Sequence, residues 1–101
     1  MDAASKKTVL ITGGGKRIGR ALCLNFAAAD WTVRVHYNRS ADAAAEVVQM
    51  ITGAGGTASA VAGDLAAFEG PDRLIEGALA DGPLDLLVNS ASVFHYDQPI
   101  A

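Results

Sequence analysis

A glycine-rich segment near the N-terminus is the part of this sequence that most directly suggests chemistry. Residues 12–19 read Thr-Gly-Gly-Gly-Lys-Arg-Ile-Gly and stand between the apolar run Val9–Ile11 and a stretch with helical spacing. A strand that leads through a glycine-rich turn into a helix can bind the pyrophosphate of a dinucleotide, because glycines let the backbone approach the phosphates and the helix N-terminus offers free N–H groups. Gly13 and Gly15 are expected to form the turn, and Gly19 to let the helix pack closely on the sheet.

Two alternative roles for these glycines compete with dinucleotide binding. A phosphate-binding loop of the Walker type is excluded for two reasons. Lys16 is followed by Arg17 rather than by Ser or Thr, and the first glycine of that motif is missing at its required spacing before Lys16. The glycines could also do no more than make a tight turn. The position between an apolar strand and a helix favours the dinucleotide site.

The segment that closes the second apolar run bears on the choice of dinucleotide. Residues 36–40 read His-Tyr-Asn-Arg-Ser and contain no acid. Folds that bind NAD usually place Asp or Glu about 20 residues after the glycines, where it bonds the ribose 2′-OH. A carboxylate would repel a 2′-phosphate, whereas the Arg39 guanidinium can pair with it through charge-assisted hydrogen bonds. The sequence therefore favours NADPH over NADH, the alternative for Arg39 being a surface loop arginine. His36 is weaker evidence, because a strand histidine is more often a partly buried residue with its own partners.

Strand and helix patterns alternate along the whole chain. Strands are expected at residues 8–11, 32–37, 57–62 and 84–88, and helices at residues 18–29, 41–52 and 71–80. Ser40 is a plausible N-cap and Gly53 a plausible C-cap of the second helix. Short links between alternating elements predict right-handed crossovers, and hence an α/β fold of the Rossmann type with a doubly wound parallel sheet. Strand order 3-2-1-4 would bring the loops after Ile11, Tyr37 and Val88 to one edge of the sheet, where ligands bind.

Composition narrows the class of protein further. The chain has 101 residues, 50% of them hydrophobic and 19% charged, which suits one domain with a modest core and no membrane-spanning segment. The N-terminus lacks an apolar signal region, and the single cysteine, Cys23, excludes an internal disulfide, so a cytoplasmic location is expected. No Cys/His cluster suggests a metal site.

Charge is distributed unevenly along the chain. Residues 1–40 hold seven Lys or Arg against two Asp, whereas the remainder holds Arg73 alone against nine Asp or Glu. A basic zone around the glycine-rich turn suits a polyphosphate ligand, although an uneven solvated surface would look the same. The net charge of −3 and the lack of interleaved aromatic and basic residues argue against nucleic acid as a partner.

The spacing Thr12-Gly13-x-x-x-Arg17-Ile18-Gly19 resembles the T-G-x-x-x-G-x-G signature of short-chain dehydrogenases/reductases, with Arg17 in place of the middle glycine. Together with residues 36–40, that replacement resembles the pteridine reductase branch, and the resemblance extends to about Pro99. It implies NADPH or NADP+ as the cofactor, with its 2′-phosphate held by the segment after the second strand. From the motifs and the resemblance together, the expected cofactor-binding residues are Gly13, Gly15, Lys16, Arg17, Ile18, Gly19, His36, Tyr37, Asn38, Arg39, Ser40, Asp64, Leu65, Asn89, Ser90, Ala91 and Ser92.

The resemblance also implies contacts beyond the phosphates. Asp64 would bond the adenine amino group, with the Leu65 backbone against the ring, although a helix-capping Asp64 is the competing account. Residues 89–92, Asn-Ser-Ala-Ser, resemble the family segment N-N-A-G or N-N-A-S, with Ser90 in place of the second Asn. The implied substrate-binding residues are Arg17, Ser92 and Phe94, and Phe94 would stack on a flat pterin ring unless it merely packs a loop.

The Tyr-x-x-x-Lys pair that donates the proton in this family is absent from these 101 residues, since Ala41 and Ile100 stand four positions after the two tyrosines. Residues 1–101 are therefore expected to be the cofactor-binding half of a longer, commonly tetrameric reductase, inactive without its C-terminal half. A pteridine or dihydrofolate-like substrate is the first hypothesis and a carbonyl such as a 3-oxoacyl thioester the second. A noncatalytic dinucleotide-binding module remains the alternative of another class, and an S-adenosylmethionine-binding fold a distant one.

Overall fold

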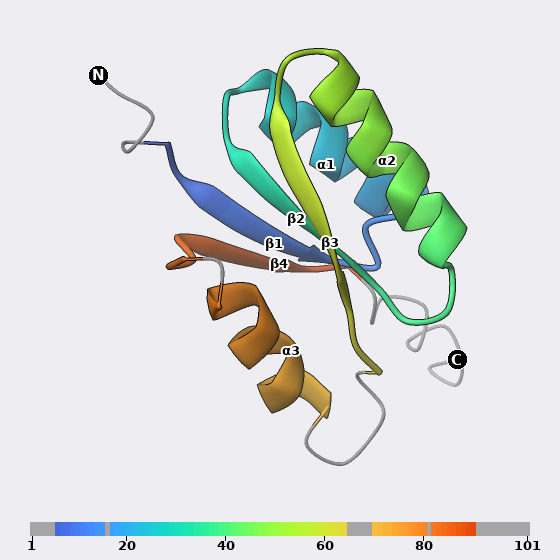
Figure 1. Ribbon diagram of the computed structural model, residues 1–101, viewed down its shortest axis with the longest axis vertical. Helices are drawn as coiled ribbons and strands as arrows, with labels where there is room; N and C mark the ends of the chain where they lie inside the picture. The colour runs from blue at the N-terminus through green and yellow to red at the C-terminus, as the bar shows by residue number, and fades with distance from the viewer. Residues whose placement is uncertain (1–5, 16, 65–69, 81, 91–101) are drawn as a thin grey trace, which may run out of the picture.

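A parallel sheet forms the central layer of the protein (Figure 1). The computed structural model describes residues 6–15, 17–64, 70–80 and 82–90. Within these ranges strands and helices alternate in the order β1 (Thr8–Thr12), α1 (Arg17–Ala28), β2 (Thr32–Tyr37), α2 (Ala41–Gly53), β3 (Thr57–Ala62), α3 (Gly70–Leu79) and β4 (Leu86–Asn89).

The described strands pair in the order β3-β2-β1-β4, and each of the three pairings is parallel. Val9 of β1, for example, lies opposite Val33 of β2 and Leu86 of β4. The chain crosses from β3 to β4 by way of α3, so the direction of winding reverses between β1 and β4. This arrangement confirms the predicted Rossmann-type fold, and it brings the carboxyl ends of all four strands to one edge of the sheet.

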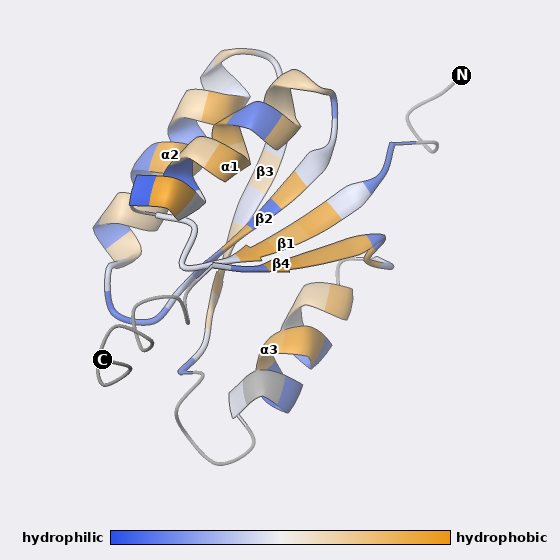
Figure 2. Cartoon of the chain, turned by 180° about the vertical axis from the view of Figure 1, so that it is seen from behind, coloured by the Kyte–Doolittle hydropathy of each residue, from blue (hydrophilic) through white to orange (hydrophobic). Residues whose placement is uncertain are grey.

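Helices cover both faces of the sheet. Figures 1 and 2 show α1 and α2 together on one face and α3 on the other. Alternate side chains of β1 divide between the two layers: Val9 and Ile11 pack toward α1 and α2, whereas Leu10 packs with Leu74 and Ala78 of α3. Burial on both faces explains why β1 reads as a continuous apolar run.

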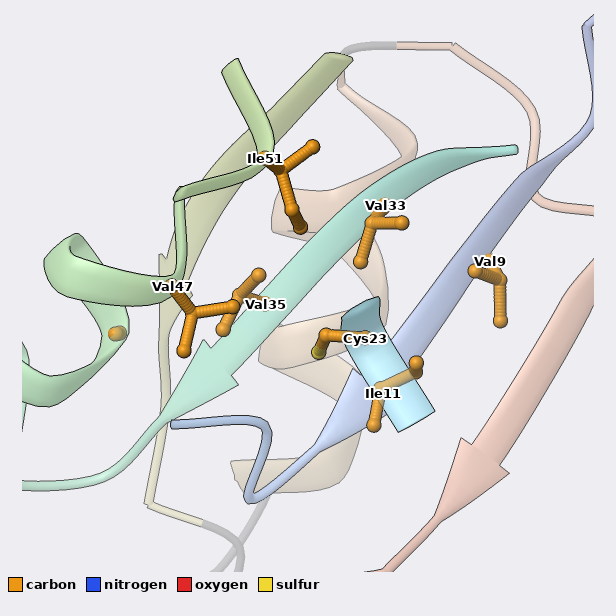
Figure 3. Packing of buried hydrophobic residues seen from close by; sticks show 8 residues of the cluster. Val9, Ile11, Cys23, Val33, Val35, Val47 and Ile51 are labelled. Atoms are coloured by element: carbon orange, nitrogen blue, oxygen red, sulfur yellow. The ribbon is translucent and has the colours of Figure 1, made fainter. Parts of the chain in front are cut away.

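The larger of the two cores lies between the sheet and the α1–α2 layer. Figure 3 shows its branched aliphatic side chains around Cys23, which is fully buried. Complete burial of each Val or Ile side chain contributes about 1.5–3 kcal/mol to folding. The members that the figure labels are Val9, Ile11, Cys23, Val33, Val35, Val47 and Ile51.

Of the two predicted caps of α2, the N-cap Ser40 is confirmed and the C-cap Gly53 requires correction. Ser40 occupies the N-cap position, but its side chain makes no capping hydrogen bond, because its ψ of 65° lies outside the usual capping geometry. Gly53 is the last helical residue rather than the C-cap, which is Ala54. The chain then turns at Gly55, whose φ of 95° is the left-handed conformation that glycine tolerates best.

The start of β4 also differs from the prediction, because the strand begins at Leu86 rather than Leu84. Leu84 instead packs against the cluster beneath α3. Asp85 joins the beginning of β1 by two hydrogen bonds: its N–H donates to the Thr8 carbonyl and its Oδ2 accepts from the Thr8 N–H, each over 2.8 Å. These contacts set where the fourth strand enters the sheet.

Leu86 and Leu87 of β4 are 39% and 49% exposed, so the described part of the sheet ends at an apolar strand. None of the helices in the described ranges has the length and apolar content that crossing a bilayer requires.

Candidate functional site

The glycine-rich turn connects β1 to α1 at the carboxyl edge of the sheet. Gly13 has a φ of 65°, a conformation that L side chains rarely adopt. Gly19 lies in the first turn of α1 directly against the glycine-rich turn: a Cβ there would be 2.1 Å from the Gly13 carbonyl oxygen and 3.0 Å from the Gly14 Cα. Only glycine permits this approach, which brings the start of α1 next to the turn.

Gly14 and Gly15 are enclosed from other directions. A Cβ on Gly14 would lie 2.9 Å from the Cys23 Sγ and 3.0 Å from the Val35 Cγ1. One on Gly15 would lie 3.0 Å from the backbone nitrogen of Ala44 in α2. The turn is therefore packed against α1, β2 and α2 at once. Sequence reasoning did not single out Gly14, and the only available signal was its place in a run of three glycines.

Arg17 stands where the short-chain dehydrogenase/reductase signature has its middle glycine, and the backbone explains that preference. The φ of Arg17 is 46°, in the left-handed region, which costs most residues other than glycine about 1–2 kcal/mol. Outliers of this kind in non-glycine residues cluster at functional sites. Arg17 is exposed at the start of α1, and its neighbour Ile18 is 64% exposed, so both side chains are accessible beside the turn.

A pocket of about 220 Å³ opens between the glycine-rich turn and the end of β2. The described residues that line it include no Asp or Glu. Asn38 and Arg39 are exposed, and within the described ranges no carboxylate forms an ion pair with Arg39. The pocket thus combines backbone from the turn with one available guanidinium. Its lining residues are Gly13, Gly15, His36, Tyr37, Asn38, Arg39 and Ser40.

The ends of β1 and β4 are joined by side chains. The Thr12 hydroxyl donates to Asn89 Oδ1 over 2.9 Å, and the Ser90 hydroxyl donates to the Thr12 carbonyl. Asp64 is exposed just beyond the end of β3. The structure thus brings the turn, residues 36–40, Asp64 and the Asn89–Ser90 pair to one edge of the sheet. The predicted site residues Lys16, Leu65, Ala91, Ser92 and Phe94 lie outside the described residues.

Cys23 lies behind the turn and is not a candidate nucleophile. Its Sγ donates to the Gly14 carbonyl over 3.6 Å. Burial raises the pKa of the thiol to about 12, since the surrounding apolar side chains disfavour the thiolate. A thiol that stays protonated behaves as a small apolar side chain.

Comparison with known proteins identifies the family. The short chain dehydrogenase family matches residues 7–101. The chain is 39% identical over 88 residues to the short-chain dehydrogenase/reductase homolog YusS of Bacillus subtilis, covering 86% of this chain and 81% of that protein. It is 36% identical over 93 residues to 3beta-hydroxysteroid dehydrogenase 1 of Eggerthella lenta, covering 91% of this chain and 36% of that protein. The protein therefore belongs to the short-chain dehydrogenase/reductase family.

Solved structures agree with this assignment. The angucycline C-6 ketoreductase LanV with bound NADP is 40% identical, with a TM-score of 0.75 over 80% of this chain and 34% of that one. FolM alternative dihydrofolate reductase 1 from Brucella canis, complexed with NADP, is 33% identical, with a TM-score of 0.71 over 80% of this chain and 32% of that one. Apart from YusS, the chain spans only about a third of the length of these relatives.

Proposed function

We propose that this chain binds NADP(H) and forms the cofactor-binding part of an NADPH-dependent reductase. The observation that carries the proposal is the pocket at the end of β2, where Arg39 is exposed and the described lining has no carboxylate. A 2′-phosphate in this pocket would meet a cation and no opposing charge. The similar LanV and FolM structures, both with NADP, support the same choice of cofactor.

The glycine-rich turn fits the pyrophosphate of this cofactor. Gly13 and Gly15 line the pocket and carry no side chain, and Gly19 leaves no room for a Cβ between α1 and the turn. In the proposal the start of α1 and Arg17 supply positive charge to the pyrophosphate, and Asp64, at the end of β3, bonds the adenine. NADPH, when bound, would supply the hydride for the reduction.

The experiment compares NADP+ and NAD+, which differ by the 2′-phosphate alone, in isothermal titration calorimetry of the chain. NADP+ is expected to bind more tightly. Arg39→Gln should remove about 10- to 100-fold of that preference, since a hydrogen bond to a charged group contributes about 1.5–3 kcal/mol. Lys7→Gln is the control, because it removes one positive charge just before β1, at the amino edge of the sheet and away from the pocket. Equal affinities for both cofactors in the unmodified chain would contradict the proposal.

For the substrate we favour a pteridine or dihydrofolate-like ring. The resemblance of residues 17 and 36–40 to pteridine reductases supports this choice, as does the similarity to FolM alternative dihydrofolate reductase 1. The second candidate is a carbonyl substrate, favoured by the 40% identity to the ketoreductase LanV. In an active enzyme, Phe94→Ala should strongly reduce turnover of pterins but leave ketone reduction nearly unchanged.

The proposal extends to the rest of the enzyme. The Tyr-x-x-x-Lys proton donor would lie in a C-terminal half, and Ala91, Ser92 and Leu65 would complete the contacts with cofactor and substrate. The complete protein would be a cytoplasmic homotetramer. Mass spectrometry of the native protein, followed by assays of NADPH oxidation with pterins, tests these points. Cofactor binding without any turnover in the complete native protein would instead favour a noncatalytic dinucleotide-binding module.

A further inference from the structure

The imidazole of His36 joins three strand ends. His36 is the fifth residue of β2 and is only 2% exposed. Its Nδ1 lies 2.9 Å from the backbone nitrogen of Gly13, just after β1, and its Nε2 lies 2.7 Å from the carbonyl oxygen of Gly63, just after β3. The ring therefore holds the carboxyl ends of β1, β2 and β3 together at the edge where the pocket opens.

These two partners determine where the proton of the ring must be. A backbone N–H can only donate, so Nδ1 accepts from Gly13, and a carbonyl oxygen can only accept, so Nε2 carries the hydrogen. The contacts thus select one neutral tautomer. A proton added to Nδ1 would set two donors against each other at Gly13 and break the link to the glycine-rich turn.

His36 contacts the turn through its backbone as well. The Gly14 N–H donates to the His36 carbonyl over 3.0 Å. The N–H groups of both Gly13 and Gly14 are therefore engaged with one residue of β2. Although His36 borders the pocket, the burial of its side chain leaves almost no surface with which to touch a ligand.

We propose that His36 is a positioning residue for the cofactor site, which holds the glycine-rich turn in its binding position through the Gly13 N–H without touching the cofactor. The inference rests on the proposed function, since the ligand concerned is NADP(H). It assigns His36 a part different from the cofactor contact expected from the sequence. It also separates two determinants of binding: Arg39 sets the preference for the 2′-phosphate, whereas His36 sets the affinity for the dinucleotide as a whole.

Two variants of His36 provide a matched pair, because each keeps one of the two hydrogen bonds. In His36→Asn the side-chain oxygen can take the place of Nδ1 and accept from Gly13, but the shorter side chain does not reach Gly63. In His36→Gln the side-chain nitrogen can take the place of Nε2 and donate to Gly63, but no acceptor faces Gly13. Both variants should be destabilised to a similar extent, which urea denaturation followed by circular dichroism measures.

The two variants should differ in cofactor binding. Calorimetry is expected to show that His36→Gln weakens NADP+ and NAD+ by the same factor, about tenfold, whereas His36→Asn stays close to the unmodified chain. Nitrogen-15 NMR of the unmodified chain should show Nε2 protonated and Nδ1 unprotonated. The Gly13 amide resonance should move in His36→Gln and remain near its place in His36→Asn.

Several results would overturn the inference. Equal loss of affinity in both variants would mean that His36 acts only through overall stability, and no loss in His36→Gln would mean that its contact with Gly13 does not support binding. An Nδ1-protonated ring in the free chain would contradict the hydrogen-bond assignment. If the unmodified chain bound neither dinucleotide, the proposed function would fail first and this inference with it, whereas NADP+ binding that is unaffected in His36→Gln would remove the inference alone.

Discussion

Replacing Gly19 by alanine adds one methyl group at the closest backbone contact in the glycine-rich turn. The new Cβ would lie 2.1 Å from the Gly13 carbonyl oxygen and 2.8 Å from its carbon, whereas real Cβ atoms essentially never come within 3.0 Å of such a neighbour. Both neighbours are backbone atoms, so no side chain can rotate away to relieve the contact. Either α1 or the turn must move.

The size of the effect follows from two opposing terms. Inserting a methyl group into a filled site costs about 1–3 kcal/mol and occasionally more, and a rigid backbone neighbour places Gly19 at the upper end. Alanine regains about 1 kcal/mol over glycine in a helix. We therefore expect Gly19→Ala to lower the free energy of unfolding by about 2 kcal/mol or more, which lowers Tm by about 10 °C at roughly 4–8 °C per kcal/mol.

Thermal unfolding followed by circular dichroism measures the effect, and Gly77→Ala in α3 serves as the control. A Cβ on Gly77 meets only the Val61 Cγ1, at an ordinary distance of 3.8 Å. This variant should therefore show the helix preference alone and gain up to about 1 kcal/mol. If Gly19→Ala unfolded at the temperature of the unmodified chain while Gly77→Ala behaved as expected, the close packing of α1 on the turn would be refuted.

Three further predictions concern the surroundings of the turn and the sheet edge. Gly14→Ala should cost about 1–3 kcal/mol through its 2.9 Å approach to the Cys23 Sγ, and a double-mutant cycle with Cys23→Ala should recover part of that loss in urea denaturation; strict additivity would contradict the contact. Because burial raises the pKa of Cys23 from 9.0 to about 12, its thiol should resist iodoacetamide in the folded chain. A thiol that reacted at the rate of the unfolded chain would contradict its burial. Because the folded pKa of Cys23 lies above the unfolded pKa, this group leaves the free energy of unfolding unchanged below about pH 9 and lowers it as the pH rises toward 12. Asp85→Ala should lower the free energy of unfolding by about 1 kcal/mol, because the Thr8 N–H loses its carboxylate acceptor, whereas Asp85→Asn should lose less; equal losses would assign that bond no net effect.

The fold could be predicted because each strand and helix carries its own pattern. The apolar run of β1 and the helical spacing of α1 depend on neighbours along the chain, and alternating elements with short links leave few topologies. Boundaries were less predictable. Leu84 looks like part of a strand in the sequence, but it packs beneath α3, and β4 begins only after Asp85 has bonded to Thr8.

Some residues of the candidate site could likewise be predicted from the sequence, and others could not. The glycines and the acid-free segment around Arg39 could be identified because the chemistry is carried by residue types at short spacing. The contacts of His36 could not, because Gly13 and Gly63 stand 23 and 27 residues away from it and no local pattern says which ring nitrogen bonds to which. Gly14 was missed for a similar reason, since its constraint comes from Cys23 and Val35.

The sequence by itself therefore determined the order of strands and helices, the glycine-rich turn and the charge available at Arg39. Those features depend on backbone preferences and on the properties of single side chains, which act over a few residues. Tertiary structure alone decided that His36 would link Gly13 to Gly63, because hydrogen bonds and close packing join atoms that only the folded sheet brings within about 3 Å of one another.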